Sequence, residues 1–115
     1  MQKNTYGKRS EIIAANYLKK KKYKILEMNY KNDIGEIDII AKDKDYIVFV
    51  EVKARMSGAF GYPFEAIDEI KQQKIQAVAS LYLVKNQKYG TNCRFDVISI
   101  LGLENPEITH IVDAF

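Results

Sequence analysis

Residues 35–55 of this chain read GEIDIIAKDKDYIVFVEVKAR, and this stretch decides the fold. In its first part, apolar side chains alternate with the carboxylates of Glu36 and Asp38, and this period of two residues predicts a strand with both acids on one face. The opposite face of the same strand would carry Ile37 and Ile39. The sequence therefore predicts a strand that presents two negative charges from one face of a sheet.

The polar segment that follows, 42–45, predicts a hairpin turn between two antiparallel strands. Residues 46–55 are rich in β-branched and aromatic side chains on both faces, which is typical of a central strand that is buried on both sides. The hairpin would hold the two strands side by side, so that the carboxylate of Asp38 lies near that of Glu51.

The segments on either side of the hairpin predict two helices and further strands. Helical spacing of apolar residues indicates helices over 7–22 and over about 68–85, the second with Asp68 as its N-cap. The glycine-rich segment 56–63 should be a loop. Strand patterns occur over 23–30, 35–41, 46–55, 94–101 and 107–112.

We therefore expect one α/β domain, residues 1–115, with a central mixed five-stranded sheet flanked by helices. Antiparallel pairs should come first, and the second helix should place a return strand in the sheet. The apolar residues that define the two helical periods are Ile12, Ala14, Ala15 and Leu18 in the first helix, and Ile70, Ile75, Val78, Ala79, Leu81 and Tyr82 in the second.

Composition limits the classes of protein to consider. The net charge of +3 does not by itself indicate a nucleic-acid binder, and the lysines of 19–24 form either a phosphate-facing stripe or a solvated helix end. The single cysteine, Cys93, excludes an intramolecular disulfide and a multi-cysteine zinc site. No apolar run approaches the ~20 residues of a membrane-spanning helix, so we expect a soluble, cytoplasmic protein without membrane contact.

The strongest local signal is Glu51-Val52-Lys53, at the end of the predicted central strand. Residues two apart share a face, so a carboxylate and an ammonium group emerge from a face that is otherwise apolar. A simple ion pair at a strand end is one interpretation. The other follows from Asp38, because two neighbouring carboxylates repel each other and a hard divalent cation would relieve that repulsion.

Two further charged residues are unexpected at their positions. Glu11 shares a helix face with small apolar residues, so it either joins the site or extends into solvent from the first helical turn. Lys71 is a cation in the first turn of the second helix, where the helix dipole disfavours it. It either points at a phosphate or pairs with Asp68 or Glu69.

Taken in order, these motifs resemble a known superfamily. A helical Glu, then Asp, then Glu-x-Lys across a hairpin, followed by a helix, looks like the PD-(D/E)XK nuclease superfamily, which includes restriction endonucleases and archaeal Holliday junction resolvases. Over nearly its whole length the chain also resembles the small bacterial YraN family of resolvase-like proteins. This resemblance rests on GEID at 35–38, FVEVKAR at 49–55, Phe60-Gly61, Lys71, RFDV at 94–97 and Ala114-Phe115.

The resemblance implies a restriction-endonuclease-like fold and a role for each site residue. Asp38, Glu51 and the backbone carbonyl of Val52 would bind Mg²⁺ or Mn²⁺. Lys53 would orient or deprotonate the attacking water, and Glu11 would hold a water molecule or a second ion. The catalytic residues would be Glu11, Asp38, Glu51 and Lys53, and contacts to the phosphates of DNA would come from Arg9, Arg55, Lys71 and Lys74.

Three functions remain open from the sequence. The first is an endonuclease that hydrolyses phosphodiester bonds of structured or branched DNA, as a Holliday junction resolvase does; cutting two strands would require a twofold homodimer. The second is a non-catalytic nucleic-acid-binding module of the same fold. The third is a homodimeric interaction domain whose carboxylates are ordinary surface groups. Lys53 favours the first, because phosphate binding alone does not require it, and the lone histidine, His110, is predicted to be structural.

Overall fold

The computed structural model describes residues 5–56, 67–88, 90–102 and 104–115. Within these residues the elements follow the predicted order of helix, three strands, helix and two strands, with bounds within two residues of those expected. The predicted loop at 56–63 lies, apart from Met56, outside the described residues. The elements are α1 (Thr5–Lys20), β1 (Lys24–Lys31), β2 (Glu36–Asp43), β3 (Tyr46–Arg55), α2 (Glu69–Lys85), β4 (Cys93–Leu101) and β5 (Glu107–Ile111).

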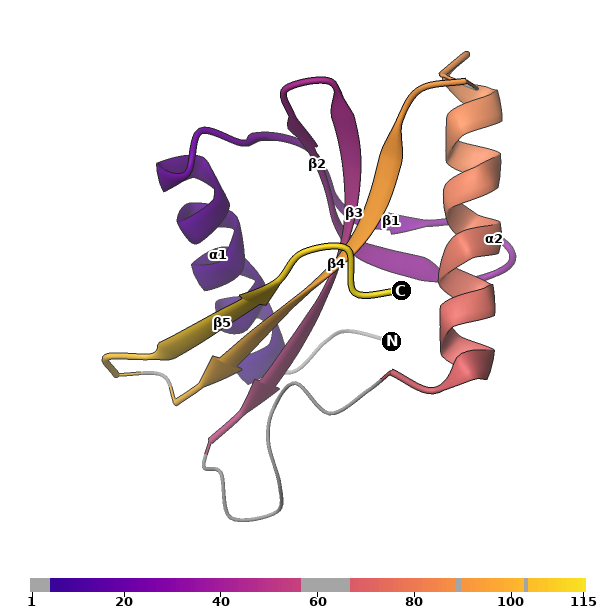
Figure 1. Ribbon diagram of the computed structural model, residues 1–115. Helices are drawn as coiled ribbons and strands as arrows, with labels where there is room; N and C mark the ends of the chain where they lie inside the picture. The colour runs from indigo at the N-terminus through magenta and orange to yellow at the C-terminus, as the bar shows by residue number, and fades with distance from the viewer. Residues whose placement is uncertain (1–4, 57–66, 89, 103) are drawn as a thin grey trace.

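The strands form one mixed sheet in the order β1-β2-β3-β4-β5. The pairs β1–β2, β2–β3 and β4–β5 are antiparallel, whereas β3 and β4 are parallel. A parallel pair requires a crossover connection, and α2 lies in the connection between β3 and β4 (Figure 1). In the described part of the chain, the predicted mixed five-stranded sheet flanked by helices is confirmed, and it is consistent with a restriction-endonuclease-like fold.

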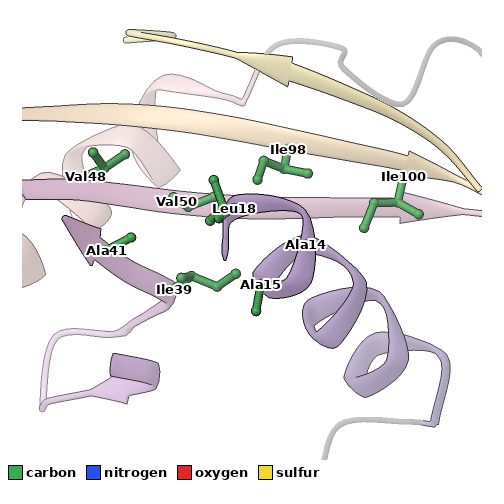
Figure 2. Packing of buried hydrophobic residues seen from close by; sticks show 9 residues of the cluster. All are labelled: Ala14, Ala15, Leu18, Ile39, Ala41, Val48, Val50, Ile98 and Ile100. Carbon is green, nitrogen blue, oxygen red and sulfur yellow. The ribbon is translucent and has the colours of Figure 1, made fainter. Parts of the chain in front are cut away.

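The two helices cover opposite faces of the sheet (Figure 1). On the α1 face, the fully buried Leu18 lies among side chains of β3 and β4 that include Val50 and Ile98 (Figure 2). Ala14 and Ala15 are buried in the same cluster, and their small side chains let the helix approach the sheet closely. Burial of each large aliphatic side chain here stabilises the fold by about 1.5–3 kcal/mol.

On the other face, α2 packs through a short buried stripe. Asp68 caps this helix as predicted, because its side chain accepts the backbone N–H of Lys71 at 2.8 Å. The ring of Tyr82 meets those of Tyr30 and Phe49 edge to face, with centroids 5.1 and 6.0 Å apart. The buried residues of α2 are Ile75, Val78, Ala79 and Tyr82.

Neither α1 nor α2 is long and apolar enough to cross a membrane.

Not all residues that define the helical periods are buried. Ile12 of α1 is 57% exposed, and Ile70 and Leu81 of α2 are 70 and 47% exposed. Helical spacing of apolar residues identifies a helix, but it does not identify which of those residues meet the sheet.

The alternation predicted for β2 breaks at Asp38. Ile37 joins the cluster on the α2 side and Ile39 joins the cluster on the α1 side, so the prediction that they share a face is wrong. Strict alternation holds where a strand is paired continuously, and β2 pairs with β3 only from Asp43 back to Ile39, which lies opposite Val50. Beyond that pair, β2 follows β1 alone.

A buried polar network joins β4, β5 and α1. Asp96 is fully buried and accepts hydrogen bonds from the guanidinium of Arg94, at 3.1 Å, and from the backbone N–H of Asp113, at 3.0 Å. The ring of His110 lies 2.8 Å from the Asp96 carboxylate and 3.3 Å from the Tyr17 hydroxyl, which gives His110 a structural position. Burial raises the pKa of Asp96, but the bonds from His110, Asp113 and Arg94 outweigh it and hold this pKa below its ordinary value.

Replacing Asp96 by Ala should destabilise the fold by about 3–5 kcal/mol, because Arg94 and His110 then lose their buried acceptor. Urea denaturation at neutral pH measures the change, with Glu104→Ala at an exposed position as the control. Because the pKa of Asp96 is lowered, its contribution is present above the ordinary value of about 3.9 and is lost as the pH falls through the folded-state value. A loss below about 1 kcal/mol would show that the network is dispensable.

Candidate functional site

One pocket of about 370 Å³ gathers the carboxylates singled out in the sequence. Its walls come from the N-terminal half of α1, the start of β2, the second half of β3 and the first turn of α2. Among the described residues, four carboxylates therefore share this depression with one lysine. The charged residues that line it are Glu11, Glu36, Asp38, Glu51 and Lys71.

Asp38 lies where β2 separates from β3. The last backbone pair between the two strands joins Ile39 to Val50. Beyond it, the backbone N–H of Val52 donates to Oδ2 of Asp38 at 2.8 Å, so a side chain replaces a backbone partner. The C=O of Val52 points to the same edge of β3 as its N–H, and so toward the same gap. Where the strands separate, a buried carboxylate and a backbone carbonyl are therefore directed at the same gap.

Glu51 projects from β3 toward the first turn of α2. Its Oε2 lies 3.3 Å from Nζ of Lys71, and its side chain is 10% exposed. Burial raises the pKa of Glu51 to about 8; the hydrogen bond and negative charge of Asp38 add to this effect, and Lys71 opposes it. The carboxylates of Asp38 and Glu51, predicted to lie close together, are thus in contact. At neutral pH, without a bound cation, Glu51 keeps its proton.

Glu11 reaches the pocket from α1. It is 5% exposed, so the alternative in which it extends into solvent is wrong. Because α1 begins at Thr5, Glu11 lies in the second turn rather than the first, away from the helix end that would favour its charge. Its neighbour Ser10 is buried with it and donates its hydroxyl to the C=O of Tyr6 at 2.8 Å. The helix thus carries a carboxylate into the protein at a point where burial of charge is costly.

Lys71 pairs with Glu51 rather than with Asp68 or Glu69. The local alternative is wrong because the Asp68 carboxylate caps the helix, so that the ammonium group reaches across to β3 instead. The side chain of Lys71 remains 51% exposed. It therefore stands between a buried carboxylate and open solvent.

Four residues predicted for the site do not line this pocket in the described part of the chain. Lys53 is half-buried on β3 and continues the face that carries Glu51. Arg9 of α1 and Lys74 of α2 are exposed, and the half-buried Arg55 ends β3. The structure therefore brings together the candidate metal ligands and Lys71, but not the lysine expected to activate water.

Tyr6 lines the pocket and was not found from the sequence. Its hydroxyl is buried and has no hydrogen-bond partner among the described residues. Burial raises the pKa of this phenol, so it stays protonated and is available as a donor. The sequence signal that could have placed Tyr6 in the pocket is its spacing from Ser10, because residues four apart lie on the same face of a helix.

The donor set fits a hard divalent cation. In the part of the chain that the structure describes, no group of three or more His, Cys, Asp or Glu side chains is arranged to hold a metal ion. Magnesium does not require such a group, because it is commonly held by one or two carboxylates together with water and substrate phosphates. Asp38, Glu51 and the C=O of Val52 are oxygen donors. The pKa of Glu51 is raised first by burial and then by Asp38, so ionising this carboxyl group is costly, and a bound cation would offset that cost.

Residues 10–100 match the model of a family described as "Uncharacterised protein family UPF0102", a range that includes Glu11, Asp38, Glu51 and Lys71. A UPF0102 protein of Clostridioides difficile (strain 630) is 50% identical over 115 residues, which is 100% of both chains. One of Caldanaerobacter subterraneus subsp. tengcongensis is 49% identical and covers 100% of this chain and 98% of the relative. A third, of Persephonella marina, is 47% identical over 95% of this chain and 91% of the relative.

Replacing Glu51 by Gln should remove a pH dependence of stability. A carboxyl group whose pKa is raised from 4.5 to about 8 stabilises the fold fully below the lower value and loses this contribution as the pH rises to the higher one. Without divalent metal, the free energy of unfolding of the unmodified protein, relative to Glu51→Gln, should fall by more than about 1 kcal/mol between about pH 5 and pH 8. Urea denaturation across this range measures the difference. Identical pH profiles of the two proteins would contradict the raised pKa.

Proposed function

The chain belongs to the uncharacterised protein family UPF0102, and we propose that it is a divalent-metal-dependent endonuclease of the PD-(D/E)XK nuclease superfamily. Its substrate would be structured or branched DNA, whose phosphodiester bonds it would hydrolyse. The observation that carries the proposal is the contact between Asp38 and Glu51, two carboxylates from adjacent strands, at the wall of an open pocket. Such a pair is costly to fold and is typical of sites that bind a cation.

In this proposal Asp38, Glu51 and the C=O of Val52 hold Mg²⁺ or Mn²⁺. The bound metal ion would supply positive charge beside the scissile phosphate and lower the pKa of the attacking water. The hydrogen bond from the N–H of Val52 fixes the orientation of the Asp38 carboxylate toward the gap. Glu51 would release its proton when the cation binds, because only the ionised carboxylate is a ligand.

The remaining pocket residues would position water and phosphate. Glu11 would accept a hydrogen bond from a water molecule on the α1 side of the pocket. Lys71 is half exposed and would turn to a phosphate oxygen once a cation neutralises Glu51. Additional phosphate contacts would come from the exposed Arg9 and Lys74 and from the half-buried Arg55.

Contacts of this kind do not read bases. Lysine and arginine contacts to phosphate fix the position of DNA without carrying sequence information. The proposed enzyme would therefore select its substrate by the path of the backbone, as at a branch or flap, rather than by base sequence. The mild net charge of +3 agrees with few, localised phosphate contacts.

One observation favours a second function, a nucleic-acid-binding module of the same fold that does not cut. Lys53 does not line the pocket among the described residues, and Lys71, which does, is paired with Glu51. A binding module would need the phosphate contacts but no lysine placed to activate water. Lys53→Ala distinguishes the two functions. It should abolish cleavage if the protein is the endonuclease, and it should leave DNA binding unchanged if the protein is the binding module.

Incubation with labelled linear, flapped and four-way-junction DNA in Mg²⁺ or Mn²⁺ should give cleavage that depends on the metal and is strongest on branched substrates. Glu51→Ala and Lys53→Ala should each reduce the single-turnover rate by at least about 100-fold, because a metal ligand or the water-activating group is lost. Glu107→Ala, at an exposed position on β5, is the control and should cut at the unmodified rate.

Two outcomes would redirect the proposal. Cleavage by Glu51→Ala at the unmodified rate would exclude this pocket as the active site. Binding of DNA without cleavage in either metal, together with a metal-dependent rise in melting temperature that Glu51→Ala removes, would establish the non-cutting module.

Replacing Lys71 by Ala should weaken DNA binding uniformly across sequences. Loss of one phosphate contact should reduce the slope of log affinity against log salt concentration by about 0.9. Fluorescence anisotropy over a salt series with metal present, and with Lys53→Ala to prevent cutting, measures this slope. Lys88→Ala, at an exposed position beyond the end of α2, is the control. An unchanged slope for Lys71→Ala would mean that this lysine serves Glu51 alone.

A further inference from the structure

Seven exposed lysines gather at the end of the sheet opposite the pocket. Four of them close α1, and the others lie where β1 begins and around the hairpin between β2 and β3. The C-terminal end of α1 and this hairpin lie at the same end of the molecule (Figure 1). We call these residues the lysine patch: Lys19, Lys20, Lys21, Lys22, Lys24, Lys42 and Lys44.

Contacts of Arg94 join the two parts of the lysine patch. Its guanidinium donates to the hydroxyl of Tyr23 at 2.6 Å and to the carboxylate of Asp43 at 3.2 Å. Tyr23 lies between two lysines of the patch in the sequence, and Asp43 lies between two others. The strand register agrees, because Lys24 of β1 is directly opposite Lys42 of β2. The two parts therefore form one surface.

The lysine patch concentrates the positive charge of the chain. Residues 19–24 and 42–46 carry seven lysines and two aspartates, so their net charge of +5 exceeds the +3 of the whole chain. One of these aspartates, Asp43, is already paired with Arg94. Within the described residues, no carboxylate lies at ion-pair distance from a lysine of the patch. The mild net charge of the chain therefore hides a strongly basic surface.

The end of a helix explains only part of the lysine patch. Lys19 and Lys20 lie in the last turn of α1 and suit the negative end of the helix dipole. This explanation does not extend to Lys24 and Lys42, whose side chains share a face of adjacent strands, where like charges directly opposite each other are destabilising. A partner with many negative charges would remove this cost.

A nucleic-acid backbone fits the lysine patch better than a membrane does. Lysines alone hold a protein weakly on an anionic membrane, and stable attachment takes a second signal, such as inserted apolar side chains. No aliphatic side chain of residues 19–24 or 42–46 is among the large exposed hydrophobic ones of the described chain. Tyr46 is 42% exposed, but its ring lies under the guanidinium of Arg94, at 5.5 Å. Duplex DNA offers about one negative charge per 1.7 Å of its axis and no apolar layer.

We propose that the lysine patch binds the phosphate backbone of duplex DNA at a site separate from the pocket. The choice of DNA as the polyanion rests on the proposed function. Lys42 lies four residues from Asp38 along β2, which is about 13 Å at 3.3 Å per residue. Phosphates of one DNA strand advance by about 3.4 Å along the axis, so the patch would contact the duplex about four or more base pairs from a phosphate in the pocket.

Fluorescence anisotropy with a labelled linear duplex over a salt series, in EDTA so that no metal-dependent cutting occurs, tests the lysine patch. The combined variant Lys24→Ala, Lys42→Ala and Lys44→Ala should lower the slope of log affinity against log salt concentration by about 2.7, or about 0.9 for each lost phosphate contact. Arginine at the same three positions keeps the charge and should keep the slope. This second variant separates loss of charge from a folding defect.

A matched control changes the net charge elsewhere. Gln73→Glu, Gln76→Glu and Ser80→Glu together lower the net charge by the same three, at exposed positions of α2 outside the lysine patch. The slope should stay unchanged, because it counts the phosphates that are neutralised and not the net charge of the protein.

Three outcomes would overturn the proposal: a slope that the three alanines leave unchanged, an equal loss of slope in the α2 control, or failure of the three arginines to keep the slope. Tighter binding to vesicles of phosphatidylserine and phosphatidylcholine than to DNA, lost with the three alanines, would instead assign the lysine patch to a membrane surface. Because no cutting is measured, a protein without nuclease activity could still show the predicted slopes, and an active nuclease could fail to show them.

Discussion

The hydrogen bond from the N–H of Val52 to the carboxylate of Asp38 is the contact on which the site depends. A backbone N–H in the interior must have a partner, and here a side chain provides it where β2 has left β3. The same bond satisfies part of the requirement of a buried carboxylate for donors. It therefore allows the sheet to open at one point while the N–H of Val52 keeps a partner, and the pocket lies at that opening.

The fold was largely predictable because its strongest signals are local. The hairpin of β2 and β3 follows from apolar alternation on both sides of a short polar turn, and the Asp68 cap follows from one side chain at a helix start. The prediction that failed also has a physical explanation. Alternation places Ile37 and Ile39 on one face only if pairing is continuous, and Asp38 interrupts it.

The site was predictable only as far as local pairing reached. Asp38 and Glu51 come together through one hairpin, so the sequence could bring them into contact. The ion pair of Lys71 depends on how α2 lies against β3, which the sequence does not reveal. The sequence therefore offered the nearby Asp68 or Glu69 as its partner, whereas the structure shows Glu51. Tyr6 enters the pocket because of the way α1 packs on the sheet, and the local signal for this was its spacing of four residues from Ser10.

β3 has an unfavourable pair of carboxyl groups on its β2 side and a favourable polar network on its β4 side. On its β2 side, the buried carboxyl groups of Asp38 and Glu51 are in contact, and without a cation this pair opposes folding as the pH rises and Glu51 loses its proton. On its other side, Asp96 of β4 lies opposite Val50, one residue from Glu51, and it holds the guanidinium of Arg94. That guanidinium lies over the ring of Tyr46 at the start of β3 and donates to Asp43 of β2. The network on β4 thus supports the strand that carries Glu51. A fold can maintain a costly arrangement of this kind only if it is supported elsewhere, and here that support lies in the neighbouring strand.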